Sequence, residues 1–152
     1  MKRVVKSYLG LMGLLILFAL GLNCRSTTSP AESNETFFTS VERASSVASD
    51  NGKHVFVHVG AEWCKPCRAL HHEIYPQPKV KEALDGFVKL ELDMDKLSKE
   101  HVALIRAMNV QSIPMVAIFS ADLQTVVQEP VVAKANAEWV LNYLGKTTAP
   151  RP

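Results

Sequence analysis

The sequence predicts an α/β domain built on a mixed sheet of about four strands, with helices on both faces. Two observations carry this prediction. Short segments rich in β-branched residues alternate with segments of helical periodicity, in the order α-β-α-β-α-β-β-α. One short segment, residues 53–60 (KHVFVHVG), is mostly apolar, as in a central strand covered on both sides. Such alternation of strands and helices implies a sheet with both faces covered.

The first half of the domain is expected to contain three helical segments and one strand. Residues 36–48 predict an amphipathic helix, because apolar residues recur from Phe37 onward at a 4-3-4 spacing. Residues 53–60 form the first strand. A helix is expected from Cys64 to about residue 74, where two prolines interrupt it, and helical character resumes over residues 79–84.

The second half is expected to contain three strands and two helices. Residues 87–92 alternate between apolar and mixed positions and predict a strand. Ser98 is placed to cap a helix that runs to residue 108. Residues 115–119 predict the next strand, with residues 124–128 as its hairpin partner. Asn136 is placed to cap the last helix.

The N-terminal 23 residues predict a signal peptide. Lys2, Arg3 and Lys6 precede an uncharged apolar run over residues 8–22, shorter than the roughly 20 residues that span a bilayer. Cys24 follows directly and resembles the cysteine of bacterial lipoprotein signals, which carries the lipid after cleavage. An ordinary cleavage site that happens to lie near this cysteine, or an uncleaved anchor, remains an alternative.

The chain is therefore divided into a leader, a polar tether beginning at the lipidated Cys24 (24–35), one domain (36–146) and a short tail (147–152). Export places the domain outside the cytosol, in the periplasm or cell envelope, where disulfides persist. Three of the 17 Lys and Arg residues lie in the leader, which has no acid, so the remaining chain carries a net charge of −1 against its 15 acidic residues. This near-neutral charge gives no reason to expect a nucleic-acid partner.

The chemistry is expected to lie in Cys64 and Cys67, which are three residues apart at the start of a helix. Disulfide exchange needs a thiolate, and unpaired N–H groups at a helix start stabilise an anion there. Lys65 adds a positive charge, and Pro66 suits an early helical position. The predicted roles are Cys64 as the exposed nucleophile and Cys67 as the more buried resolving thiol.

Other uses of a cysteine pair compete with this interpretation. A zinc site needs further cysteine or histidine ligands at matching spacing, and c-type haem attachment needs a histidine where this chain has Arg68. A permanent structural disulfide is also possible. No metal or cofactor is expected. Cysteine parity supports the redox interpretation, because lipidation of Cys24 would leave Cys64 and Cys67 as a pair.

Two motifs resemble the thioredoxin family over residues 41–144. Residues 61–67 (AEWCKPC) resemble its active-site segment, and residues 112–114 (SIP) resemble its cis-proline loop. The longer stretch after the active site resembles the C-terminal domain of the bacterial thiol:disulfide interchange reductase and small exported thioredoxin-like proteins. This resemblance implies a thioredoxin fold, a cis bond before Pro114 and backbone pairing of Ile113 with substrate. Trp63 is expected to form a flat surface beside Cys64, with packing in the core as the alternative.

One departure from the family concerns the residue six positions before the first cysteine. Thioredoxins carry a buried Asp there, and this chain has His58. A neutral imidazole could accept the proton of Cys67, and the alternative is a core histidine satisfied by a hydrogen bond. His71 and His72 are expected to be solvated, because neighbours on a helix point about 100° apart.

The sequence therefore predicts a thiol–disulfide oxidoreductase that acts on disulfides of exported proteins. Ile113 before the proline resembles reducing members of the family and favours reduction or exchange over oxidation. Expected partners are protein thiols and disulfides, a membrane protein that donates electrons, and a bacterial membrane that holds the lipid on Cys24. The alternative is a copper-handling protein that uses Cys64, Cys67 and a nearby histidine.

Overall fold

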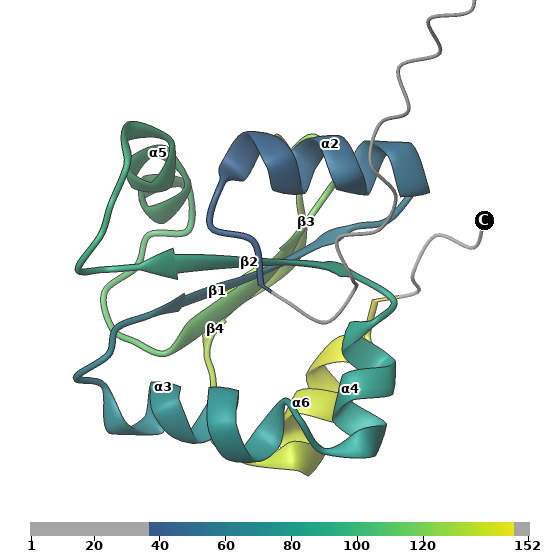
Figure 1. The fold of residues 1–152 in the computed structure, drawn as a ribbon, viewed down its shortest axis with the longest axis vertical. Coiled ribbons are helices and arrows are strands. Elements are labelled where there is room, and N and C mark those ends of the chain that lie inside the picture. The colour runs from purple at the N-terminus through teal and green to yellow at the C-terminus, as the bar shows by residue number, and fades with distance from the viewer. Residues whose placement is uncertain (1–36, 148–152) are drawn as a thin grey trace, which may run out of the picture. The chain divides into compact units, whose positions relative to one another are not determined.

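The computed structural model describes residues 37–147 (Figure 1). The expected signal peptide, Cys24 and the expected tether lie outside the described residues, as does most of the tail. Within the described part, no helix combines the length and apolar character needed to cross a membrane.

A mixed sheet of four strands forms the centre of the domain. The strands are β1 (Val55–Gly60), β2 (Val88–Asp93), β3 (Met115–Phe119) and β4 (Val126–Val132). Their order in the sheet is β2-β1-β3-β4, with β1 and β2 parallel and the other two pairs antiparallel. The predicted sheet of about four strands is confirmed, and β1 is central, with every residue buried.

Helices cover both faces of the sheet (Figure 1). One face carries α2 (Val41–Asn51) and α5 (Lys99–Ala107). The other carries α3 (Lys65–Ala69), the π-helix η1 (Leu70–Ile74), α4 (Pro78–Leu84) and α6 (Ala137–Leu144). The expected caps are present: Ser98 Oγ accepts from the His101 N–H at 3.2 Å, and Asn136 Oδ1 accepts from the Trp139 N–H at 2.9 Å.

Alternation along β1 divides the core into two apolar clusters. Val55, Val57 and Val59 pack with residues of α2 and α5. Phe56 packs with residues of η1, α4 and α6 on the opposite face. Because side chains alternate along a strand, His58 shares the face of Phe56. It therefore points toward the helical layer that begins at the cysteine pair.

The first helix begins five residues later than predicted, at Val41. Ser40 caps it, with its Oγ accepting from the Arg43 N–H at 3.2 Å. The preceding residues pair with the edge of β2 instead: the Phe38 N–H donates to Lys89 O, and the Glu91 N–H donates to Phe38 O, both at 2.8 Å. Backbone pairing with an open sheet edge outweighs the local helical spacing that Phe37 provides.

The helix after the cysteine pair and the hairpin strand also differ from the sequence prediction. The helix expected over residues 64–74 changes to a π-helix at Leu70, closed by a bond from the Tyr75 N–H to Leu70 O at 2.8 Å. The hairpin partner begins at Val126 and is longer than expected. The turn before it extends to Thr125, whose carbonyl accepts from the Ser120 N–H at 2.9 Å.

Candidate active site

Cys64 and Cys67 form a disulfide at the start of α3, directly after the loop that leaves β1. The Sγ–Sγ distance is 2.05 Å and the Cα atoms are 5.3 Å apart. Cys64 is the N-cap residue, and its Sγ accepts from the Cys67 N–H at 3.3 Å. Lys65 and Pro66 occupy the first helical positions, as predicted. One orphan N–H of the helix start is therefore directed at the sulfur of Cys64.

Both cysteines are buried in the disulfide form. Cys64 is 5% exposed and Cys67 is 2% exposed. The expectation that Cys64 would be openly exposed is wrong for this oxidised form, because Ala61, Met94 and Ile113 pack around the pair. The order of exposure between the two cysteines is the expected one.

Three further residues of the predicted motifs are Ile113, Pro114 and Trp63. The peptide bond between Ile113 and Pro114 is cis, as the family resemblance implied. Ile113 packs against the cysteine cluster, and Pro114 O accepts from the Ala133 N–H at 2.8 Å. Trp63 is 68% exposed, and its Nε1–H donates to Asp95 Oδ1 at 3.2 Å. An apolar ring is thus held at the surface next to Cys64.

His58 is completely buried, with one ring nitrogen bonded and the other open. Its Nδ1 lies 2.7 Å from the Tyr75 hydroxyl, whereas Nε2 has no hydrogen-bond partner. A Cβ built on Gly60 would lie 2.7 Å from His58 Nε2 and 3.4 Å from Cys67 Cβ. The missing side chain of Gly60 therefore leaves the space through which the imidazole and Cys67 approach each other.

His71 belongs to the same cluster, and the prediction that it would be solvated is wrong. Its ring centroid lies 4.6 Å from that of His58 and 5.2 Å from that of Tyr75. Its Nε2 lies 3.4 Å from Glu91 Oε1, outside hydrogen-bonding geometry. The wider turn of η1 directs both His71 and Tyr75 toward the sheet, while His72 is exposed, as predicted.

Burial dominates the electrostatics of this cluster. It lowers the pKa of His58 well below its usual value, and His71 adds to the shift. The pKa of His71 is lowered to about 4, first by burial and then by the adjacent His72. Burial raises the pKa of Tyr75 above its usual range, with a smaller contribution from Glu91. Both imidazoles are therefore neutral near pH 7, and the Tyr75 hydroxyl keeps its proton.

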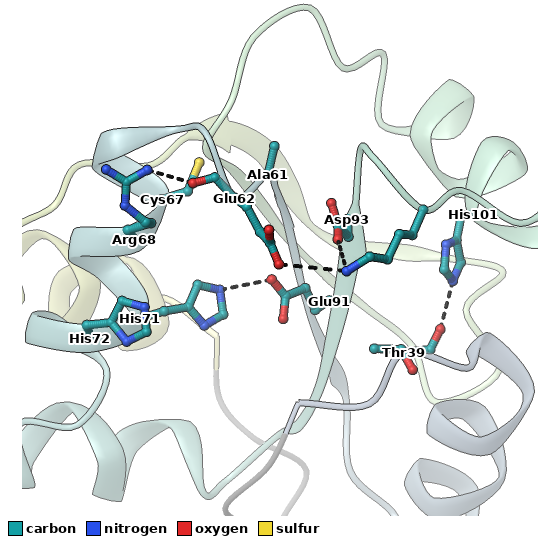
Figure 2. Close-up of a pocket in the computed structure, with 11 residues that line it drawn as sticks. Thr39, Ala61, Glu62, Cys67, Arg68, His71, His72, Glu91, Asp93 and His101 are labelled. Carbon is teal, nitrogen blue, oxygen red and sulfur yellow. Dashed lines mark hydrogen bonds and ion pairs between the residues drawn. The ribbon is translucent and has the colours of Figure 1, made fainter.

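A groove of about 820 Å³ opens beside Cys67 (Figure 2). Arg68 and His71 line one side, and Glu91 and Asp93 line the other. Figure 2 shows His71 directed at Glu91 across this space. Arg68 Nη1 donates to the backbone oxygen of Glu62 at 2.6 Å, which ties α3 to the loop before it. His71 therefore connects the buried cluster around His58 to a groove with charged walls next to Cys67.

Residues 41–145 match the family model described as a thioredoxin-like domain. The chain belongs to the thioredoxin-like domain family. Over 75 residues, 49% of this chain and 13% of the relative, it is 35% identical to the thiol:disulfide interchange protein DsbD of Cronobacter sakazakii. Over 113 residues, 74% of this chain and 20% of the relative, it is 26% identical to DsbD of Salmonella typhimurium.

Solved structures give the same assignment of the fold. The C-terminal domain of Neisseria meningitidis DsbD in the oxidised form has a TM-score of 0.62 at 19% identity, with 74% of this chain and 100% of that chain covered. A thioredoxin of Thermus thermophilus has a TM-score of 0.60 at 18% identity, covering 74% of this chain and 86% of that chain. The predicted thioredoxin fold and the relation to the DsbD C-terminal domain are confirmed.

The sequence prediction missed three residues of this thioredoxin-like site: Gly60, His71 and Tyr75. Each signal was present but ambiguous, because a glycine after a strand, a histidine pair and a tyrosine before a proline all occur without function. Within residues 37–147, no group of three or more His, Cys, Asp and Glu side chains is arranged to hold a metal ion.

Replacing Gly60 with Ala is expected to destabilise the thioredoxin-like domain by about 1–3 kcal/mol, as overpacking of a dense core does. The new Cβ would meet His58 Nε2 at 2.7 Å, and the buried ring has no room to retreat. Urea unfolding measures the change. Gly145→Ala is the control, since its Cβ would meet only Leu141 O at 3.2 Å at an exposed helix end. Equal stability of the two variants would contradict the close approach at Gly60.

Proposed function

We propose that this thioredoxin-like domain is a thiol–disulfide oxidoreductase that uses Cys64 and Cys67 to reduce or exchange disulfides in exported proteins. The observation that carries the proposal is the Cys64–Cys67 disulfide at the N-terminus of α3, with Ile113 packed against it. The curated relatives named thiol:disulfide interchange proteins support the same chemistry. This chain spans only 13% to 20% of the length of those relatives, so their full activity is not carried over.

In the reduced domain, Cys64 is the attacking thiolate. The Cys67 N–H, 3.3 Å from Cys64 Sγ, and the positive charge of Lys65 stabilise the negative sulfur. Attack on a substrate disulfide forms a bond between Cys64 and one substrate sulfur. The other substrate sulfur leaves as a thiolate and takes up a proton from water. Exposed Trp63 and the backbone of Ile113 are the surfaces we assign to the substrate chain.

Cys67 resolves the mixed disulfide. Its thiol gives a proton to His58 Nε2, and the resulting thiolate attacks Cys64 Sγ and displaces the second substrate sulfur. Two electrons pass from the cysteine pair to the substrate disulfide, and the pair ends as the disulfide seen here. The orphaned Nε2 and the space at Gly60 support His58 in this role. Proton transfer by a positioned group contributes about 10²–10⁴-fold to a rate.

The oxidised pair needs a dithiol to reduce it by the reverse exchange. We propose that a membrane protein supplies these electrons and that the domain works outside the cytosol, held at a bacterial membrane through a lipid on Cys24. The hydrophobic leader and the cysteine that follows it support this placement. Reduction is favoured over oxidation because Ile113 stands before the cis-proline, as in reducing relatives.

The redox potential of the cysteine pair tests the proposal. Equilibration of purified protein with a dithiol buffer, followed by mass spectrometry of the alkylated protein, gives the fraction oxidised. We expect a potential of about −270 mV, as in thioredoxins, whereas strong oxidants of this fold have potentials of about −120 mV. A value at the oxidising end would overturn the direction of transfer. A pair that does not equilibrate with any dithiol would overturn the proposed function.

A further inference from the structure

Tyr75 is the only hydrogen-bond partner that the structure gives to the imidazole of His58 among residues 37–147. The hydroxyl lies 2.7 Å from His58 Nδ1, and both side chains are buried. Tyr75 directly follows η1, where its N–H closes the last π turn on Leu70 O. The π-helix therefore brings the phenol to the side of the imidazole that faces away from Gly60.

The imidazole is also fixed in orientation by aromatic rings. Phe37 and Tyr75 meet it edge to face, with centroid distances of 6.4 Å and 5.7 Å. His71 packs against it at 4.6 Å. A half-turn of the ring would carry Nδ1 away from the Tyr75 hydroxyl and place a carbon there. Packing thus fixes the plane of the ring, and the hydrogen bond decides which edge of the ring faces Tyr75.

A neutral imidazole has two tautomers, and the surroundings of Nε2 decide between them. If Nε2 carried the proton, a buried N–H would have no acceptor, because Nε2 has no partner. Orphaned buried N–H groups are rare, and acceptors without a full set of donors are better tolerated. The favoured tautomer carries the proton on Nδ1, which donates to the Tyr75 oxygen and leaves a lone pair on Nε2.

We propose that Tyr75 is a positioning residue: it holds His58 in the tautomer protonated at Nδ1, so that Nε2 stays a lone-pair acceptor beside Cys67. The proposal rests on the proposed function, in which His58 receives the proton of the resolving thiol. The hydroxyl of Tyr75 keeps its own proton. When its oxygen accepts from His58, the phenol O–H needs a different acceptor, and Tyr75 lines a cavity of about 610 Å³ that Glu91 also lines.

The neutral hydroxyl of Tyr75 stabilises the imidazolium form of His58 less than a carboxylate partner would. A buried carboxylate on Nδ1 would stabilise the imidazolium after proton transfer. The Tyr75 hydroxyl cannot do so, because burial keeps it neutral. The titratable groups that face His58 are Cys67 on α3, His71 on η1 and Glu91, its register partner on β2. Protonated His58 is therefore a short-lived state that returns its proton quickly.

The test is Tyr75→Phe, which keeps the ring and removes only the hydroxyl. Nitrogen-15 NMR of the purified protein reports which ring nitrogen of His58 carries the proton, with no need for turnover. We expect the wild type to be protonated at Nδ1 and the variant to lose this preference. The resolving step, followed as release of a preformed mixed disulfide at Cys64, should slow by about tenfold or more, within the range of general-base catalysis. Its pH profile should change, while the first attack by Cys64 keeps its rate.

Tyr143→Phe is the matched control. Tyr143 is also buried and hydrogen-bonded, but its hydroxyl donates to the backbone at Glu129 O, 3.2 Å away on β4. We expect this variant to leave the His58 tautomer and the resolving rate unchanged. A wild-type His58 protonated at Nε2, or an unchanged tautomer in Tyr75→Phe, would overturn the positioning role. A changed tautomer with an unchanged release rate would instead remove His58 as acceptor, which is a failure of the proposed function.

Discussion

Replacing Cys67 with Ser is expected to stop the reaction at the mixed disulfide, whereas replacing Cys64 with Ser is expected to prevent any reaction. Cys64 is the more exposed sulfur and receives the N–H of the helix start. Cys67 is the less exposed of the two and lies by Gly60, near the imidazole of His58. Without the resolving thiol, the substrate stays attached to Cys64. Turnover should fall to the uncatalysed level in both variants.

Incubation with a disulfide-containing peptide, followed by mass spectrometry without reductant, separates the two cases. The Cys67→Ser protein should gain the mass of one peptide thiol, and dithiothreitol should release it. The Cys64→Ser protein should gain none. Cys24→Ser is the control. It keeps both Cys64 and Cys67, so its turnover should equal that of the wild type. A covalent adduct on Cys67 in Cys64→Ser, at the wild-type rate, would reverse the assigned roles.

Elements with a local stop or start signal were predicted well. The helices capped by Ser98 and Asn136 begin where the capping residues indicate, because the cap bonds form within one turn. The strand at residues 115–119 also has the predicted bounds. Residues 37–40 were predicted to be helical because the apolar spacing that begins at Phe37 fits a helix. The backbone of Phe38 instead pairs with β2, about fifty residues away in the chain, and no local pattern reveals that partner.

In the candidate site, too, residues in short sequence motifs were predicted, whereas residues placed by distant packing were not. Cys64, Cys67 and Ile113 stand in short motifs, and the structure packs them together in one cluster. His71 was expected to be solvated on the assumption of a regular α-helix. The π turn that redirects it, and brings Tyr75 to His58, depends on packing between η1 and the sheet. Sequence periodicity cannot predict a local change in the number of residues per turn.

Acidification is expected to destabilise the domain from about pH 6.5 downward. The unfolded chain binds a proton at each histidine below its ordinary pKa of about 6.5, while burial keeps His58 and His71 neutral in the folded domain to lower pH. Folded and unfolded states then differ by up to one proton for each of the two residues. The free energy of unfolding falls by up to about 1.4 kcal/mol per pH unit for His58 and by less for the partly exposed His71.

The pH range over which His71 lowers stability ends near its folded pKa of about 4. Toward the acidic end of this range, Glu91 acts in the opposite direction. Burial and then Asp93 raise the pKa of Glu91, so the folded domain takes up a proton there before the unfolded chain does. The steepest loss of stability is therefore expected between pH 6.5 and about 5. Urea unfolding at several pH values from 8 to 4.5 measures this slope.

His58→Gln removes one of the two titrating groups and should flatten the slope by up to about 1.4 kcal/mol per pH unit, whatever its effect on stability at pH 8. Tyr143→Phe, a buried substitution that removes no group titrating between pH 4.5 and 8, should leave the slope as in the wild type. A wild-type stability that stays constant from pH 6.5 to 5 would mean that the folded and unfolded protein take up the same number of protons in this range. His58 would then titrate in the folded domain as it does in the unfolded chain, which would contradict the effect of its complete burial on its pKa.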